Sequence, residues 1–192
     1  TAEIYTRSIV GSVRGVEETV PIVGDVKNVW REFACIWKKQ ELTFNEAALA
    51  KWWEALEAWR SRDCLRIPEA DGDIILPQMV VRTLAEVTNN DAIITSDVGQ
   101  HQMFAAQYYP FERPRQWLNS GGLGTMGVGL PYAMGAYLAD PSKDVCCITG
   151  EGSIQMNIQE LSTCFQYKLP IKTICLNNGY LGMVRQWQEL YY

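Results

Sequence analysis

Two short apolar runs are each followed by a side chain that could bind a metal ion. Residues 145–149 precede Glu151, which carries a carboxylate, and residues 171–176 precede Asn178, which carries an amide oxygen. If both runs are parallel strands, their carboxyl ends open at one edge of a sheet, where open α/β folds bind ligands. Hard oxygen ligands beside a phosphate are the set that Mg²⁺ prefers. The pattern therefore predicts a magnesium–diphosphate site.

A pair of glycines favours the phosphate part of this site. Gly150 and Gly152 would let the backbone approach a ligand closely, and a helix is predicted to start at Ser153. The free N–H groups and the positive dipole end of such a helix suit a phosphate. Residues 153–176 leave room for one helix and one strand between the two halves of the site. Taken alone, each half also fits an ordinary strand–turn–helix, with the asparagines capping a turn.

The elements that must position these residues follow from apolar periodicity. From residue 77 onward strands and helices alternate, which predicts an α/β fold: a parallel sheet flanked by helices. The strands are expected over residues 92–97, 116–118, 145–149 and 171–176. The helices are expected over residues 76–87, 100–108, 126–139 (interrupted near Pro131), 154–167, and from 181 onward. Their expected inward-facing residues include Met79, Val80, Leu84 and Val87 in the first helix, and Ile154, Ile158, Leu161 and Phe165 in the fourth.

Two more amphipathic patterns precede this region. Apolar spacing predicts helices over residues 26–38 and 46–60, after a short strand and turn over 19–25. Either Thr43 or Asn45 could cap the second helix. The polar segment 63–73, which contains a proline and a glycine, predicts a linker. The second helix carries an aromatic face, which is expected to pack on a core rather than to stack on bases: Trp52, Trp53, Leu56 and Trp59.

Composition excludes several classes of protein. Hydrophobic residues make up 47% of the chain and charged residues 20%, as in globular proteins. The net charge is −5 and no basic stripe occurs, so nucleic acid is not an expected partner. No apolar run approaches the ~20 residues that a membrane span needs, and residues 1–10 do not resemble a secretory signal. The six cysteines form no Cys-x-x-Cys pair, so reduced thiols are expected, with Cys146, Cys147 and Cys175 in buried strands.

A glycine segment offers a competing interpretation. Residues 122–127 match Gly-x-Gly-x-x-Gly, the pattern of nicotinamide dinucleotide-binding enzymes. That pattern should follow a long buried strand, whereas residues 115–119 are short and polar. The motif alone is therefore a weak signal for a Rossmann cofactor.

Four separated motifs, in order, resemble the catalytic subunit of acetolactate synthase (acetohydroxyacid synthase). They are residues 96–103, 120–127, the pair 150–152 with 177–178, and 182–187. The similarity covers roughly residues 20–192. It implies a thiamine diphosphate-binding fold that is truncated at the C-terminus.

The resemblance also implies a division of the chain. Residues 1–40 would be the tail of a middle, flavin-associated domain, residues 41–75 a helical linker, and residues 76–192 an incomplete thiamine diphosphate-binding domain. A self-contained N-terminal cap is the alternative for the first part.

By resemblance, the diphosphate-bound Mg²⁺ takes the side chains of Glu151 and Asn178 and the backbone carbonyl of Tyr180. One departure matters, because the family has an aspartate where this chain has Glu151. The extra methylene moves the carboxylate outward by ~1.5 Å, about one carbon–carbon bond. Since Mg²⁺ accepts a narrow range of ligand distances, we expect weaker metal and cofactor binding than an aspartate would give.

The family's remaining roles map onto this chain as expectations. Met126 would prop the cofactor in its bent form, although plain core packing also fits, and Gly124 would keep the backbone near the pyrimidine. Gln100 and His101 are expected as cofactor contacts rather than acid–base groups. The full expected cofactor set is Gln100, His101, Gly124, Met126, Gly150, Gly152, Ser153, Asn178, Gly182 and Met183. Met156 and Trp187 would line the substrate pocket, with a buried hydrophobic patch as the alternative.

The activity implied is decarboxylation of pyruvate and transfer of the two-carbon unit to pyruvate or 2-oxobutyrate, in branched-chain amino-acid biosynthesis. The family's activating glutamate belongs to a domain outside this chain, as does most of the FAD site, so no catalytic residue is assigned and the chain alone is expected to be inactive. The family also implies a homo-oligomer, a possible regulatory subunit and, in bacteria, a cytoplasmic location. A non-catalytic cofactor-binding fragment and another thiamine diphosphate enzyme, such as a pyruvate oxidase or carboligase, are the alternatives.

Overall fold

The computed structural model describes residues 22–192 except 42 and 44. The chain divides into two compact units, residues 1–62 and 63–192.

The described part of the first unit consists of two helices, α2 (Val26–Lys39) and α3 (Glu46–Arg60). Asp25 caps α2 by accepting a hydrogen bond from the Asn28 N–H at 3.1 Å. Of the two expected caps of α3, it is Asn45 that accepts from the N–H of Ala48, at 3.0 Å. Both helices are thus confirmed. Of the strand and turn expected over 19–25, residues 19–21 lie outside the described residues, and residues 22–25 form no helix or strand.

The expectation that the aromatic face of α3 packs on a core is wrong for the described residues. Trp52, Trp53 and Trp59 are 53%, 48% and 51% exposed. Trp52 and Trp59 meet edge to face, with ring centroids 5.7 Å apart. Since an α-helix brings positions seven apart onto one face, the tryptophans shield each other without any core beneath them.

The second unit is built on a four-stranded parallel sheet, as predicted. Its strands are β1 (Ile93–Ser96), β2 (Trp117–Leu118), β3 (Val145–Thr149) and β4 (Lys172–Cys175), in the order β2-β1-β3-β4. Segment 63–73 has no helix or strand, as expected of a linker. Among the described residues, no helix combines the length and apolarity that a membrane crossing requires.

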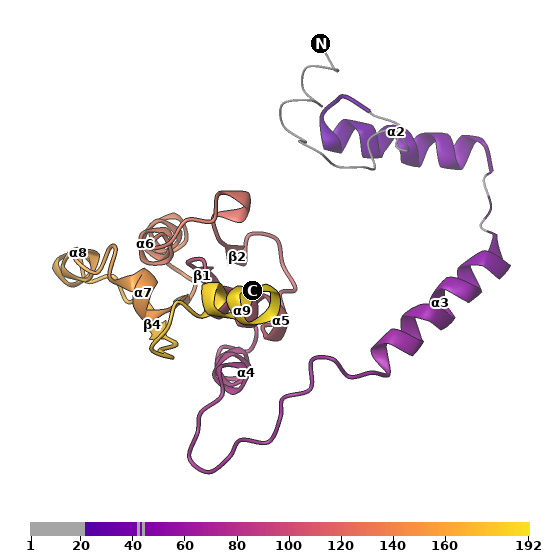
Figure 1. Ribbon diagram of the computed structural model, residues 1–192. Helices are drawn as coiled ribbons and strands as arrows, with labels where there is room; N and C mark the ends of the chain where they lie inside the picture. The colour runs from indigo at the N-terminus through magenta and orange to yellow at the C-terminus, as the bar shows by residue number, and fades with distance from the viewer. Residues whose placement is uncertain (1–21, 42, 44) are drawn as a thin grey trace. The chain divides into compact units, whose positions relative to one another are not determined.

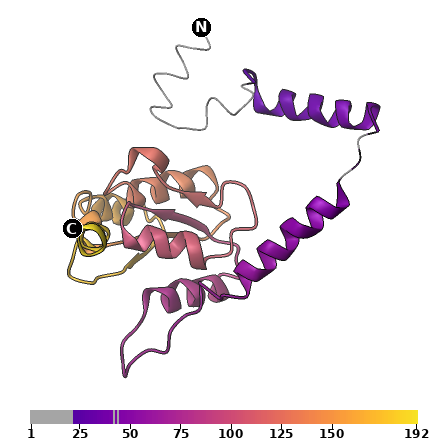
Figure 2. The ribbon, with the colours of Figure 1, turned by 45° about the vertical axis from the view of Figure 1, so that its right-hand side comes forward.

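Helices cover both faces of this sheet (Figures 1 and 2). On one face α4 (Pro77–Val87) and α5 (Gln100–Tyr108) pack on Ile94, Cys146 and Ile148. On the other face α6 (Gly129–Ala139) and α8 (Glu160–Gln166) pack on Val145 and Cys147. Alternate residues of β3 therefore pack against the helices on opposite faces of the sheet. The whole strand is buried, as expected of a central strand in a parallel sheet.

The core side of α4 differs from the prediction. Its buried residues are Val81, Leu84 and Ala85, whereas Met79 is 42% and Val87 70% exposed. The prediction grouped a helical stripe correctly around Leu84 but placed its centre one position off. A stripe of large side chains cannot reveal that the small Ala85 faces inward.

Two helices have bounds that differ from those predicted by the apolar periodicity. The helix expected over 126–139 starts at Gly129, because Gly127 has φ +78°, outside the helical region. Pro131 causes no interruption, since it sits in the first turn, where its missing N–H has no helical partner. The helix expected over 154–167 is two, α7 (Glu151–Ile154) and α8.

The expected inward face of that region is also wrong in part. Ile158, Leu161 and Phe165 are exposed, Phe165 by 88%, and Cys164 is the buried residue of α8. Among the described strands β4 is an edge of the sheet, so side chains near it are covered by fewer neighbours than those near the central strands. Cys175 on β4 is accordingly exposed rather than buried.

Cys146 and Cys147 are buried as expected. Burial raises the pKa of the Cys147 thiol to about 12, so it stays protonated and unreactive at neutral pH.

Candidate cofactor and metal site

The strand order creates a crevice between β1 and β3. The chain leaves β1 through α5 toward β2 and leaves β3 through α7 and α8 toward β4, so adjacent strands lead in opposite directions across the sheet. Ligands of open α/β sheets bind outside the carboxyl ends of strands at such a reversal. Ser96 pairs with Ile148 and Thr149 with Cys175, so all three strands end near one level.

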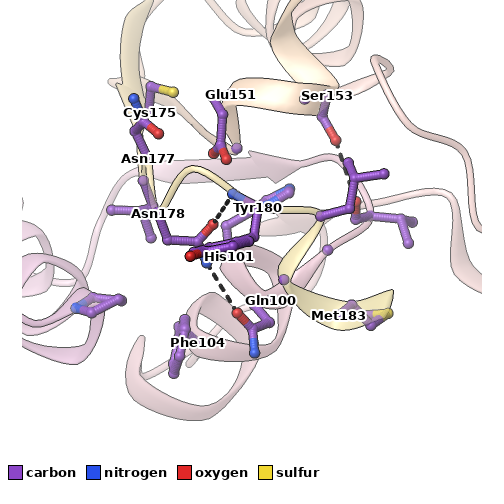
Figure 3. Close-up of a pocket in the computed structure, with 18 of the residues that line it drawn as sticks. Gln100, His101, Phe104, Glu151, Ser153, Cys175, Asn177, Asn178, Tyr180 and Met183 are labelled. Atoms are coloured by element: carbon purple, nitrogen blue, oxygen red, sulfur yellow. Dashed lines mark hydrogen bonds between the residues drawn. The ribbon is translucent and has the colours of Figure 1, made fainter. Parts of the chain in front are cut away.

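A cavity of about 480 Å³ opens at this edge. It brings together most of the predicted site residues: Gln100, His101, Met126, Gly150, Glu151, Gly152, Ser153, Asn178, Tyr180, Gly182 and Met183. Figure 3 shows how the labelled ones among them converge from α5, the turn after β3, and the segment after β4.

Three predicted residues lie outside the cavity lining. Gly124, with φ +64°, ends the short 3-10 helix η2 (Gly121–Leu123), and no atom lies near the place of its missing Cβ. Met156 is 54% and Trp187 57% exposed, and Trp187 stacks on Tyr191 with centroids 4.8 Å apart. Their pyrimidine and substrate roles stay predictions.

His101 is wedged between the backbones of the two central strand ends. A Cβ at Gly99 would lie 2.5 Å from Cε1 of His101, and a Cβ at Gly150 would lie 2.7 Å from its Nδ1. Gly150 therefore makes room for a side chain of this chain, rather than only for a ligand. Nε2 of His101 is buried without a hydrogen-bond partner among the described residues. Such an orphaned polar atom at a cavity wall is suited to a ligand.

The charge state of His101 follows from this position. Burial lowers the pKa of the imidazole below its ordinary value, against opposing effects of the Asp97 charge, a hydrogen bond to the Asp97 backbone and the Glu151 charge. The ring is therefore neutral at physiological pH, and a neutral imidazole nitrogen can accept a hydrogen bond.

Asp97, the first residue after β1, ties three elements together. Its side chain is buried, with 1% exposed. Oδ1 accepts from the Gly129 N–H at 2.5 Å, which caps α6, and Oδ2 accepts from the Thr149 hydroxyl at the end of β3. The hydroxyl of Thr95 adds a bond of 2.8 Å to the Gly129 carbonyl. The sequence motif contained Asp97 but the prediction gave it no role; its place directly after a strand, like that of Glu151, was the available signal.

The expected metal ligands face one another across the cavity. The carboxylate of Glu151 points toward the loop that carries Asn178 and Tyr180 (Figure 3). Oδ1 of Asn178 accepts from the Tyr180 N–H at 3.1 Å, and an amide oxygen has a second lone pair. No cluster of three His, Cys, Asp or Glu side chains suited to a metal occurs in the described part of the chain. A metal here would thus have a mixed oxygen set, completed by a ligand.

The glycine-rich turn after β3 is tightly packed. A Cβ at Gly152 would lie 2.8 Å from Cδ2 of Leu181 and 3.9 Å from Cε of Met126. The hydroxyl of Ser153 donates to the Val98 carbonyl at 3.3 Å. The helix here begins at Glu151, not at Ser153, and α7 has only four residues, so the long helix dipole expected behind a phosphate is replaced by a single turn.

A family comparison identifies the fold of this region. Residues 97–192, half of the chain, match the model of the thiamine pyrophosphate enzyme C-terminal TPP-binding domain. The chain belongs to the thiamine pyrophosphate enzyme family. Thiamine pyrophosphate is another name for thiamine diphosphate, so the predicted recognition, fold and cofactor class are confirmed, and the nicotinamide interpretation of residues 122–127 is set aside. Indeed, the strand before that motif, β2, has only two residues.

Several relatives of this member of the thiamine pyrophosphate enzyme family are acetolactate synthases. The chain is 51% identical over 177 residues to the acetolactate synthase isozyme 3 large subunit of Escherichia coli, covering 92% of this chain and 31% of that protein. It is 50% identical to the acetolactate synthase large subunit of Haemophilus influenzae, over 93% of this chain and 31% of that protein. It is 47% identical to the acetolactate synthase of Mycobacterium bovis, over 90% of this chain and 28% of that protein. The chain thus spans about 30% of the length of these relatives.

The residues present fit the family's cofactor. The cavity offers a carboxylate, an amide oxygen and a carbonyl, which suit Mg²⁺ rather than a softer metal. It also offers an orphaned imidazole nitrogen and an apolar wall that includes Met126 and Met183.

His101 generates a prediction for the pH dependence of stability. It is the only histidine in the chain. Histidine is the only type of side chain whose ordinary pKa lies between about pH 5 and 8, so a change in stability over that range is assigned to His101. Because the folded pKa is lowered, the unfolded chain binds more protons, and the free energy of unfolding should fall as pH drops below about 6.5, by at most about 1.4 kcal/mol per unit. Urea unfolding at several pH values measures this; His101→Gln should flatten the profile, and a stability that rises on acidification would contradict the assignment.

Asp97 generates a second prediction. Asp97→Ala removes the acceptor of two buried hydrogen bonds. Because a hydrogen bond to a charged group contributes about 1.5–3 kcal/mol, the free energy of unfolding should fall by at least that amount. Asp97→Asn keeps an oxygen for the Gly129 N–H and should recover more than half of the loss. Asp144→Ala is the matched control, since Asp144 pairs with Lys172 in an exposed salt bridge and should cost less than about 1 kcal/mol. Equal losses for Asp97→Ala and Asp144→Ala would show that Asp97 does not tie the strand ends.

Proposed function

We propose that this chain is the thiamine diphosphate-binding part of an acetolactate synthase. The observation that carries the proposal is the convergence of Glu151, Asn178 and Tyr180 on one cavity at the reversal between β1 and β3. The names of the relatives support the choice of enzyme. In this proposal the complete protein joins two 2-oxo acids, with pyruvate as the first and pyruvate or 2-oxobutyrate as the second.

The proposed roles of the residues follow from their placement. Mg²⁺ would be held by the Glu151 carboxylate, the Asn178 amide oxygen and the Tyr180 carbonyl, and the cofactor's diphosphate would complete its shell. Met126 would support the cofactor from the apolar wall of the cavity. The neutral His101 would accept a hydrogen bond at Nε2. The bound cofactor supplies the carbanion chemistry that decarboxylation of a 2-oxo acid needs.

Other features of the whole enzyme belong to the same proposal. They are FAD binding through a middle domain to which residues 1–40 would contribute, a helical linker over 41–75, assembly into a homo-oligomer with a regulatory subunit, and a cytoplasmic location in a bacterium. Since the chain spans about 30% of its relatives and holds no assigned activating carboxylate, we propose that it binds the cofactor but does not turn over substrate by itself.

Calorimetry tests this function directly. Thiamine diphosphate titrated into the purified chain should bind when Mg²⁺ is present, because Glu151 and Asn178 would hold the diphosphate through the metal. Chelating the metal should abolish the binding, and NADH should not bind in either condition. Acetolactate formation from pyruvate should be absent. Binding that is indifferent to Mg²⁺ would count against the site, and turnover by the chain alone would count against the proposed division of labour.

The glutamate at the metal position generates a further prediction. Glu151→Asp shortens the side chain by one methylene and should tighten Mg²⁺ binding by about tenfold, the lower end of what changes in a metal's surroundings do to affinity. Titration of Mg²⁺ at fixed thiamine diphosphate measures the change. Glu160→Asp, in the first turn of α8 and outside the cavity lining, is the matched control. Equal affinity of Glu151→Asp and the parent would mean that the longer side chain folds back and costs nothing.

A further inference from the structure

A chain of three side-chain amides runs from the metal loop to α9 (Gly182–Tyr191). Nδ2 of Asn178 donates to Oε1 of Gln100 at 3.1 Å, and Nε2 of Gln100 donates to Oε1 of Gln186 at 3.0 Å. The three residues come from the segment after β4, the first turn of α5, and the middle of α9. Figure 3 shows the first of these bonds as a dashed line between Asn178 and Gln100.

The direction of these bonds decides which end of Asn178 faces a metal. An amide has a donor end and an acceptor end, and a cation accepts only the oxygen. With Nδ2 held by Gln100, Oδ1 is turned toward the Tyr180 N–H, and its second lone pair stays available to a cation. Gln100 can hold Nδ2 only with its own oxygen, and it presents that oxygen because its nitrogen is bound by Gln186.

Gly182 shows that this arrangement is closely packed. A Cβ at Gly182 would overlap Oε1 of Gln100 and lie 2.8 Å from Nδ2 of Asn178. No positive φ is required at Gly182, so the backbone there would accept an alanine. The glycine is needed for the space that the first amide bond occupies.

We propose that Gln186 is a positioning residue for the metal site, acting through Gln100 on the orientation of the Asn178 amide. Gln186 does not line the cavity, so we propose for it an indirect role rather than that of a ligand. This inference rests on the proposed function, because it takes Asn178 as a ligand of Mg²⁺. It adds that the position of α9 affects the orientation of the Asn178 side chain through a relay of two hydrogen bonds.

The experiment compares Mg²⁺ affinity in variants of the full chain, by calorimetry at fixed thiamine diphosphate. Gln186→Met keeps the length of the side chain but removes the acceptor, and it should weaken Mg²⁺ binding by about tenfold, as loss of a residue behind a metal ligand does. Gln186→Glu keeps an acceptor and should restore binding to within about threefold of the parent, on the same scale. Gln188→Met, on the opposite side of α9, is the matched control and should have no effect.

Two further variants separate positioning from folding. Gly182→Ala should push the Gln100 side chain aside and weaken Mg²⁺ binding as Gln186→Met does, without lowering the free energy of unfolding, since alanine is the better helix former. In a Gln100→Met background, Gln186→Met should have no additional effect, because the relay is already broken.

Hydrogen exchange gives a readout that needs no cofactor. The Tyr180 N–H, bound to Asn178 Oδ1, should exchange faster in Gln186→Met than in the parent or in Gln188→Met. If the parent binds the cofactor with Mg²⁺ and Gln186→Met binds it equally well with unchanged exchange, the relay is overturned while the proposed function stands. If the parent binds neither thiamine diphosphate nor Mg²⁺, the proposed function is wrong, and the positioning role of Gln186 is wrong with it.

Discussion

One buried carboxylate holds the crevice on which the rest of the site depends. Asp97 leaves the end of β1 and binds both the first N–H of α6 and the hydroxyl that ends β3. Without a residue of this length and charge, the two central strand ends would lose the side-chain hydrogen bond between Asp97 and Thr149, and the α6 N-terminus would lack the cap that Val128 does not supply. The strand ends are therefore held at a fixed separation before any ligand arrives, which is the preorganisation that a binding site needs.

His101 fills the space that this separation creates. Gly99 and Gly150 flank its ring so closely that a methyl group at either position would collide with it. The two glycines thus have a structural reason that is independent of phosphate binding. Their consequence is functional all the same, because they leave the imidazole buried, neutral and with one nitrogen that no described residue satisfies at the cavity wall.

The sequence predicted those parts of the fold that depend on local periodicity and on strand order. The bounds of α5 and β3 agree with the prediction, because each is flanked by glycine or by a polar turn. The split between α7 and α8 and the exposure of Phe165 were missed, since an apolar pattern states that a side chain could be buried, not that another layer covers it. The relay through Gln186 was missed for a related reason. Three amides separated by 78 and 86 positions carry no periodic signal, and only the folded chain brings them together.

The two halves of the predicted chemistry differ in how completely this chain forms them. The residues predicted to hold the metal and the diphosphate converge because they sit at strand ends, whose positions the sheet determines. Met156 and Trp187, predicted for substrate, lie on turns or helix faces with more than half of their surface exposed. A pocket that discriminates one methylene must surround the substrate with apolar walls, and neither of these exposed side chains lines the cavity. The cavity at the strand ends is therefore formed by this chain, whereas the substrate roles of Met156 and Trp187 stay predictions.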